Sequence, residues 1–362
     1  MPLTTVQSGM MDSIAQYNSF KNRIINGAMQ IDQRNAGASV TQIVANTYTV
    51  DRFAIYGSVT SKFTAQQNAA SVTPPAGFTN YLGITSSSAY SVLTGDYFGV
   101  YQNIEGFNTS DLAWGTANAQ TITLSFWVRS SLTGTFGGSL LNNGYTRSYP
   151  FTFTINSANT WEKETITITG DTSGTWLTNN GVGVRVWFNL GAGATYSGTA
   201  NAWSGASSFA PTGATSVVGT NGATFYITGV QLEKGSTATA FDYRPYGTEL
   251  QLCQRYLPAY NGIGTYSSGG VWQSSSIVRG YFVFPVTTRV APTGVSTPNI
   301  SQISCTDDIS ATNVATALGS LVQASVYAAA VDFTAATATQ TRVARVIGNV
   351  GTGQLLFTGC EL

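Results

Sequence analysis

The residues that could catalyse a reaction are few, because the 362-residue chain contains no histidine. Without histidine, His-based triads and most proton shuttles near neutral pH are excluded. Glycoside hydrolysis needs only two carboxylates that flank the scissile bond, and two pairs could supply them: Glu162 with Glu164, and Asp307 with Asp308. The first pair shares a face of a predicted strand and the second lies in a predicted turn. We interpret both pairs as solvated structural groups and expect no enzyme; a polysaccharide-degrading enzyme is the least favoured alternative.

The aromatic residues are more informative, since the chain has 7 Trp, 18 Tyr and 18 Phe. Flat rings stack on the apolar faces of sugars while polar side chains bind the hydroxyls, and this recognition needs no net charge. Some rings lie in Gly-, Ser- and Asn-rich stretches such as "NNGYTRSYP", "GTANAWSGASSF" and "TYSSGGVWQSSS". The candidate carbohydrate-binding residues are therefore Trp272, Tyr266, Trp203, Tyr145 and Tyr149.

The more common role of such a ring is to pin its loop to the core of its own domain. For Trp203 and Trp272 this role is the alternative to sugar binding. Three further tryptophans, Trp127, Trp161 and Trp187, fall within or beside predicted strands. We interpret them as packing residues.

Metal and redox chemistry have little support. The three cysteines are an odd number at wide spacing, and without histidine they cannot form a common Cys/His zinc site. We interpret Cys253, Cys305 and Cys360 as free, mostly buried thiols and expect no cofactor. In "YTVDRF" we interpret Asp51 as a turn residue or as the partner of Arg52; a calcium ligand is the alternative.

The composition excludes two classes of partner. The 16 Lys and Arg balance the 16 Asp and Glu, so no net positive field exists to attract nucleic acid. No basic segment precedes an apolar run at the N-terminus, and no run of about 18 apolar residues could insert into a membrane. Only 9% of the residues are charged, and 39 are Gly. We expect a β-rich protein that is made in a bacterial cytoplasm and released by lysis.

Alternating apolar and polar residues predict strands at "TITLSFWV", "TITITG" and "GVGVRVWF". In "FYITGVQL" the apolar phase changes at Gly229, which predicts a β-bulge. Further strands are predicted at "IVRGYFVFPV" and "GQLLFTGCEL", and we favour a strand in the ambiguous segment "ATNVATALGSLVQASVYAAAV". Gly- and Asn-rich turns between these runs are typical of antiparallel sheets.

A short helix is predicted between two β regions. In "GTELQLCQRYLP", Thr248 is the expected N-cap and Gln251 its capping-box partner, and Pro258 ends the pattern. Residues 1–21 show no clear period and are expected to form an arm or a short helix.

Several motifs together resemble a known family. "NRIINGAMQIDQRNAG", "YTVDRF", "TITLSFWVRSSLTGTF", "GVQLEKGSTATAFDYR", "ELQLCQRYL" and the terminal "CEL" are similar to phage fibre and tail proteins that carry a carbohydrate-binding-module-like jelly roll. The resemblance extends from about residue 22 to residue 362. Matched positions such as Asp51, Glu233, Arg244, Arg255 and Tyr256 look like scaffold residues, so the resemblance identifies no sugar site.

The resemblance implies an all-β fold: a jelly-roll β-sandwich, a short connector helix and a second, sandwich-like C-terminal β domain. We expect a virion-attachment arm over residues 1–21, the jelly roll over 22–247, the helix over 248–258 and the C-terminal domain over 259–362.

The resemblance also implies a non-enzymatic appendage, a tail or head fibre, on the surface of a phage particle. Its expected partners are two further copies in a homotrimer, other virion proteins through the arm, and host cell-surface glycans. A purely structural decoration or adaptor protein is the alternative.

Overall fold

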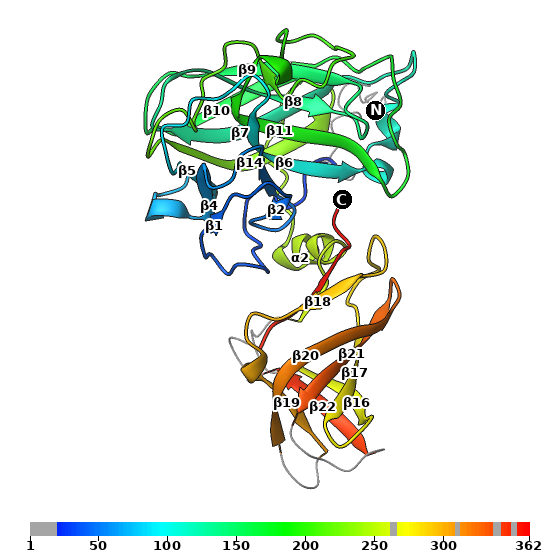
Figure 1. Ribbon diagram of the computed structural model, residues 1–362. Coiled ribbons are helices and arrows are strands. Elements are labelled where there is room, and N and C mark those ends of the chain that lie inside the picture. Colours follow the sequence, from blue (N-terminus) through cyan, green and yellow to red (C-terminus); the bar gives the residue numbers. More distant parts are fainter. Residues whose placement is uncertain (1–19, 261–265, 308–311, 336–341, 349–352) are drawn as a thin grey trace, which may run out of the picture. The chain divides into compact units, whose positions relative to one another are not determined.

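The computed structural model describes residues 20–260, 266–307, 312–335, 342–348 and 353–362, and the expected arm over residues 1–21 lies almost wholly outside them. The chain forms two compact units, which divide between Arg244 and Pro245 (Figure 1). The regular secondary structure of the described part is almost entirely β-strand, so the all-β prediction is confirmed. No helix in the described ranges is long and apolar enough to cross a membrane.

The first unit is a β-sandwich of two six-stranded sheets (Figure 1). Sheet A contains, in spatial order, β1 (Val40–Thr41), β4 (Phe63–Gln67), β5 (Leu82–Ser86), β14 (Thr224–Lys234), β7 (Ile122–Ser130) and β10 (Glu162–Ile168). Sheet B contains β2 (Thr47–Tyr48), β3 (Ala54–Gly57), β6 (Tyr97–Glu105), β11 (Val182–Ala192), β8 (Gly134–Leu141) and β9 (Ser148–Ile155). Strand pairing within both sheets is antiparallel, as predicted.

Short elements connect these strands. They are the two-stranded pair β12 (Ser197–Gly198) and β13 (Ala210–Pro211), and the 3-10 turns η1 (Ala69–Ser71), η2 (Gly106–Asn108), η3 (Ser110–Leu112) and η4 (Ala194–Tyr196).

The core of the sandwich is formed by alternate residues of each strand, because successive side chains of a strand point to opposite faces. Phe126 of sheet A meets Phe188 and Phe153 of sheet B edge to face, with ring centroids 5.1 Å apart in both pairs. All three rings belong to one buried cluster. This inward packing leaves the other residues of β7 and β11 on the outer faces of the sheets.

The predicted bulge at Gly229 is confirmed. The pairing of β14 with β7 slips between Thr228 and Gln231, and Gly229 has φ +61°, a conformation that strains other residues. A Cβ atom at this position would also come within 2.6 Å of the Phe78 ring.

The second unit begins with α2 (Tyr246–Gln254), the single α-helix of the described residues. The expected capping box is wrong: the helix starts at Tyr246 after Pro245, and no side chain caps it. Pro245 occupies the N-cap position three residues before Thr248, so that threonine lies inside the helix. The helix ends at Gln254, ahead of Pro258.

The rest of this unit is a closed six-stranded barrel with a small sheet, which refines the expected sandwich-like arrangement. The barrel contains β16 (Tyr266–Trp272), β17 (Ile277–Val283), β21 (Ala328–Ala335), β20 (Thr312–Ala324), β19 (Ile303–Thr306) and β22 (Val343–Gly348). The small sheet contains β15 (Ala259–Tyr260), β23 (Leu355–Thr358) and β18 (Gly294–Ser296), and η5 (Ile300–Gln302) is a 3-10 turn. The ambiguous segment at residues 311–331 forms β20 and the start of β21, so the favoured strand is confirmed.

All three cysteines are free and buried, as predicted. Burial raises the pKa of Cys305 to about 12 and that of Cys360 to about 11. Because the thiolate is the reactive form, buried thiols with raised pKa values react slowly.

We therefore predict that native protein at about pH 8 resists an aromatic disulfide reagent, since Cys253, Cys305 and Cys360 are all fully covered. All three thiols should react once guanidinium unfolds the chain. Rapid modification of any cysteine in the native protein would contradict the packing described above.

Candidate functional site

The outer face of sheet B carries a group of aromatic side chains. Tyr97 and Tyr101 point outward from β6 and Trp187 from β11, because the intervening residues of both strands face the core. The strand register places Trp187 directly opposite Tyr101. With side chains from β3 and three loops, these rings enclose a hollow of about 220 Å³. We call this hollow the aromatic cleft; its lining residues are Asn46, Tyr56, Tyr97, Tyr101, Tyr145, Arg185, Trp187 and Phe209.

Gly99 makes the floor of the aromatic cleft possible. A Cβ atom built on Gly99 would lie 2.2 Å from the Trp187 indole, so the ring occupies the space that a side chain would fill. Trp187 is 2% exposed and stacks on Tyr101, with centroids 5.2 Å apart and planes 14° apart. Tyr101 and Trp187 therefore form a fixed surface rather than mobile groups.

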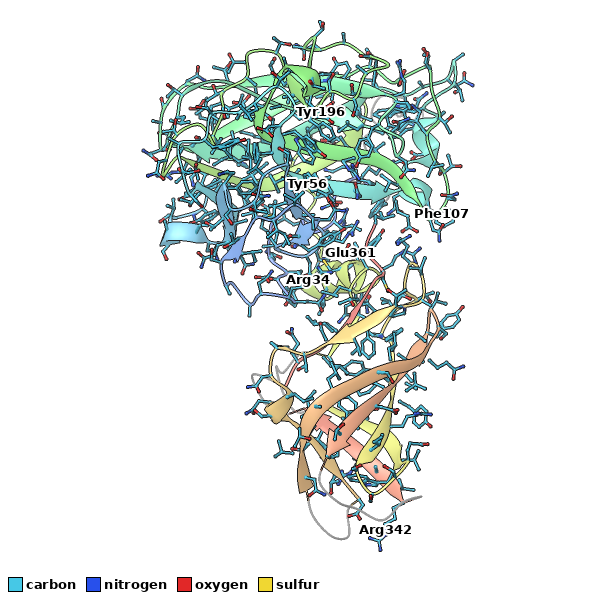
Figure 2. All side chains as sticks on the ribbon, in the orientation of Figure 1. Arg34, Tyr56, Phe107, Tyr196, Arg342 and Glu361 are labelled. Carbon is cyan, nitrogen blue, oxygen red and sulfur yellow. The ribbon has the colours of Figure 1, made fainter. Side chains whose placement is uncertain are left out.

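A second stack leads outward from this floor. Tyr97 lies nearly parallel to Phe209 at 4.6 Å and to Tyr56 at 5.2 Å, with interplanar angles of 11° and 14°. Tyr56 and Tyr97 are half-buried, whereas Phe209 is buried. Tyr56 and Tyr196, which also contacts Tyr97, can be followed in Figure 2. The accessible parts of Tyr56 and Tyr97 are thus held in place by neighbouring rings.

Arg185 supplies the one formal charge among the residues that line the aromatic cleft. Its guanidinium carbon lies 5.0 Å from the centroid of Tyr101 and 4.6 Å from that of Tyr145. Its Nε donates a hydrogen bond of 2.6 Å to Oδ1 of Asn103. Burial lowers the pKa of Arg185, while the nearby tyrosines oppose that shift, and a guanidinium stays protonated under ordinary conditions.

The aromatic cleft is suited to binding and not to proton transfer. Burial raises the pKa of Tyr97 well above its usual range, so the phenol stays neutral. None of the lining residues is a carboxylate. Rigid rings beside phenol, amide and guanidinium groups match the pattern by which proteins hold the faces and hydroxyls of a sugar.

The five sequence-predicted residues do not come together. Tyr145 does line the aromatic cleft, where it is 37% exposed. Tyr149 is buried and packs against Trp203 at 5.1 Å, in a separate cluster. Tyr266 opens β16, but its side chain lies outside the described part of the chain.

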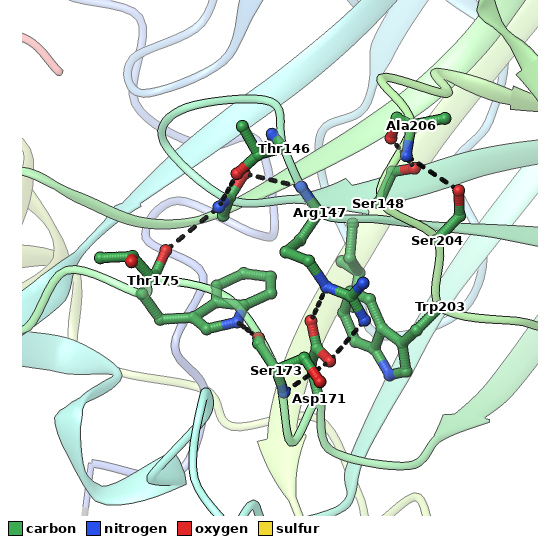
Figure 3. Close-up of polar contacts among 12 residues, drawn as sticks. Thr146, Arg147, Ser148, Asp171, Ser173, Thr175, Trp203, Ser204 and Ala206 are labelled. Carbon is green, nitrogen blue, oxygen red and sulfur yellow. Dashed lines mark hydrogen bonds and ion pairs between the residues drawn. The ribbon is translucent and has the colours of Figure 1, made fainter.

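Trp203 pins its loop to the core, which is the alternative to sugar binding that the sequence analysis gave for this residue. Its ring meets Trp114 and Trp176 edge to face at 5.3 and 5.5 Å, and its indole N–H donates to the Thr169 carbonyl at 2.8 Å. The same region contains a two-pronged ion pair, in which Arg147 contacts Asp171 at 2.6 and 2.7 Å (Figure 3). These contacts indicate a structural role for this loop.

The prediction of a recognition role for Trp272 is wrong. This residue is 1% exposed and lies in the barrel core with Phe282 and Val346. It closes β16 opposite Val278 of β17, and strand alternation places its side chain on the same inner face as buried Ser268, despite the polar neighbours in sequence.

Three of the acidic residues singled out from the sequence have structural partners: Glu162, Asp307 and Asp51. Glu162 accepts hydrogen bonds from the amides of Asn156 and Ser157 at 3.0 and 2.8 Å, and so caps the turn between β9 and β10. Burial alone would raise the pKa of Glu162, but these hydrogen bonds outweigh it and lower that pKa. Burial raises the pKa of Glu164. Neither glutamate lines the aromatic cleft.

Asp307 pairs with Arg342 at 3.0 Å, and Asp308 lies outside the described residues. Asp51 is buried and accepts hydrogen bonds from the amide and the side chain of Gln33 at 2.9 and 2.5 Å, which fits a structural role. Within the described ranges, no group of three or more His, Cys, Asp or Glu residues is placed to hold a metal ion.

A larger hollow of about 570 Å³ is less suited to binding. Its lining carries three cations and one carboxylate, and these groups already have contacts within the protein: Arg23 and Lys234 contact Asp111 at 2.8 and 3.9 Å. Lys21 donates to the carbonyl of Ala240.

Sequence reasoning missed most of the aromatic cleft. Trp187 packs as predicted and is 2% exposed, but its strand position did not indicate a place in the cleft floor, and Tyr97, Tyr101 and Arg185 were not singled out from the sequence. The segments "YFGVYQN" and "VRVWFN" do indicate a binding surface, because residues on both faces of each strand have large side chains. A strand with an apolar inner face and aromatic or charged residues on its outer face predicts a binding surface on the sheet.

No model of a known protein family matches the sequence, and a search of curated proteins returns no match. Similar solved structures include the enzymatically active domain of tailspike protein 4 of bacteriophage CBA120, with 11% identity and a TM-score of 0.31. That alignment covers 59% of this chain, which spans only 21% of the tailspike chain.

Another similar structure is the family 11 carbohydrate-binding module of Clostridium thermocellum in complex with a β-1,3-1,4-mixed-linked tetrasaccharide. The two are 11% identical, the TM-score is 0.28, and the alignment covers 55% of this chain and 98% of the module. A third is the module TmCBM61 in complex with β-1,4-galactotriose, with 10% identity and a TM-score of 0.27, covering 51% and 88% of the two chains.

The burial of Trp272 generates a stability prediction. Replacing it with alanine should lower the free energy of unfolding of the second unit by about 3–5 kcal/mol, because removal of the large ring leaves a cavity in the barrel core. Thermal and denaturant unfolding would measure this loss. The matched control is Val343→Ala on β22, where the side chain is 79% exposed and little change is expected. A wild-type melting temperature for Trp272→Ala would show that the ring is not part of the core.

Proposed function

We propose that the chain is a non-enzymatic appendage of a bacteriophage particle that contacts host surface glycans through the aromatic cleft. The observation that carries the glycan part is the cleft itself: a rigid floor of Trp187 and Tyr101, with the partly exposed rings of Tyr56 and Tyr97 above it. The phage part is supported by the sequence motifs that resemble fibre and tail proteins. On this proposal the protein is made in the bacterial cytoplasm and is found at the virion surface.

The geometry favours recognition of a short stretch of glycan. A hollow of about 220 Å³ is smaller than the range of roughly 300–1,000 Å³ that is typical of drug-sized ligands. One or two sugar rings would therefore fill it, and the remainder of a polysaccharide would extend into solvent. Weak single contacts of this kind become effective when several copies bind one surface.

The cleft proposal predicts the effect of removing a ring. Tyr97→Ala and Tyr56→Ala should each weaken binding to a recognised polysaccharide about fivefold or more, taking about 1 kcal/mol for a lost aromatic contact. Affinity electrophoresis or calorimetry against a panel of bacterial surface polysaccharides would measure this change.

The control for these variants is Phe107→Ala, since Phe107 is in the same sandwich, is 58% exposed and does not line the cleft (Figure 2). Melting temperatures must show that Tyr97→Ala and Tyr56→Ala remain folded. Folded variants that bind as tightly as the wild type would place recognition elsewhere.

A second candidate function is a purely structural decoration or adaptor protein, and the exterior of the barrel favours it. Ile277, Tyr281 and Val283 point outward from β17 and are 36%, 53% and 73% exposed. Tyr327 is 63% exposed and lies next to the end of this strand, because the Phe284 amide donates to its carbonyl. Exposed apolar side chains that gather on one strand are typical of surfaces that contact another protein.

We propose that this strand contributes to a homotrimer, and light scattering at micromolar concentration should return about three times the chain mass of 38.1 kDa. Val283→Asp should shift the population toward monomers, because a carboxylate would be buried without a partner. The control Ile43→Asp introduces the same charge at a 46% exposed position of the sandwich and should leave the mass unchanged. A monomer mass for the wild type would contradict the trimer.

A further inference from the structure

Arg185 is a buried cation that lacks an acidic partner within the described residues. Arg185 is only 9% exposed, yet within the described residues its guanidinium contacts the Asn103 amide oxygen and two tyrosine rings. Two other arginines have carboxylate partners: Arg147 contacts Asp171 and Arg279 contacts Asp332, at 2.6 and 2.8 Å. Arg185 therefore differs from them by facing a cleft instead of a carboxylate.

Burying an unpaired charge is costly, because the charge loses its hydration. The faces of Tyr101 and Tyr145 recover part of this loss, since a guanidinium is attracted to an aromatic ring. The hydrogen bond from Nε to Asn103 holds the plane of the group. The two terminal nitrogens have no protein partner in the described part of the chain, although neither is enclosed away from solvent.

The rest of the cleft does not offset this positive charge. The lining residues are neutral apart from Arg185, and burial keeps the Tyr97 phenol protonated. A fixed guanidinium with two free terminal nitrogens matches the geometry of a carboxylate, which can accept two parallel hydrogen bonds. Low exposure strengthens such a contact relative to one in open solvent.

We propose that the aromatic cleft selects an acidic glycan, in which a sugar carboxylate pairs with Arg185 while the ring packs against the accessible parts of Tyr56 and Tyr97. This inference rests on the proposed glycan-binding function and adds the chemical class of the sugar. Uronic and sialic acids share the required chemistry: a planar carboxylate on a ring with an apolar face. Neutral sugars with the same ring would lose the ion pair and keep only the stacking.

The test uses the full chain and a panel of carboxylated polysaccharides, including polygalacturonate and polysialate, each paired with its carboxyl-reduced neutral form. Calorimetry or immobilised-glycan binding would give the affinity for both forms. We expect at least one acidic polymer to bind tenfold or more tightly than its reduced form. We also expect this preference to weaken as salt rises from about 50 to 500 mM, because salt screens the ion pair.

Three variants link this preference to Arg185. Arg185→Gln should abolish the difference between the acidic and reduced forms, while Arg185→Lys should keep part of it, because lysine retains the charge without the two-pronged geometry. Arg129→Gln is the matched control: Arg129 also lies over a tyrosine ring, Tyr226, at 5.5 Å, but on sheet A. Melting temperatures would show that each variant is folded, and Arg185→Lys keeps the test valid should Arg185→Gln unfold.

The outcomes separate the two proposals. If an acidic polymer and its reduced form bind equally and the Tyr97→Ala variant weakens both, glycan binding stands and the preference for acidic sugars is overturned. If the acidic preference survives Arg185→Gln, the carboxylate is recognised elsewhere and the inference is also overturned. If no member of the panel binds the wild type, the proposed function falls together with the inference.

Discussion

The packing of Phe126 against Phe188 and Phe153 between the two sheets is the constraint on which the rest of the sandwich depends. These rings meet edge to face in a fully buried position, and aromatic pairs of this kind add roughly 0.5–1.5 kcal/mol beyond the area they bury. Because a shift of one residue would turn every inward side chain outward, the core fixes the strand register. The same register that buries Phe188 places Trp187 on the outer face of sheet B.

The aromatic cleft is thus a consequence of the core and not an independent loop feature. β6 and β11 each bury one set of residues and present the other, and Gly99 leaves the space in which the Trp187 ring lies. Arg185 lies on the same face and is held by Asn103. A binding surface built on central strands is more rigid than one built on loops, and a rigid surface loses less conformational entropy when a ligand binds.

The strands could be predicted from the sequence because apolar and polar residues alternate along them, and the apolar residues mark the face that packs against the core. Gly229 was recognised for the same reason, since the bulge interrupts that alternation. The sites of recognition could not be predicted in this way. Trp272 stands among Ser and Gly and was assigned to the surface, but barrel closure buries it. Trp187 stands in an apolar strand and packs as predicted, but strand pairing also makes its covered ring part of the cleft floor. In both cases the deciding contacts come from strands that are distant in sequence.

The central claim, that the aromatic cleft holds a sugar ring, can be tested directly with the indole N–H signals of the seven tryptophans. A titration would use a short oligosaccharide from the polysaccharide that binds most tightly, and would follow these signals by NMR after assignment through single Trp→Phe variants. The account predicts that the Trp187 signal shifts with saturation, while the signals of Trp203 in its loop and Trp272 in the barrel core stay in place. A saturable shift at Trp203 or Trp272 with an unmoved Trp187 signal would contradict it.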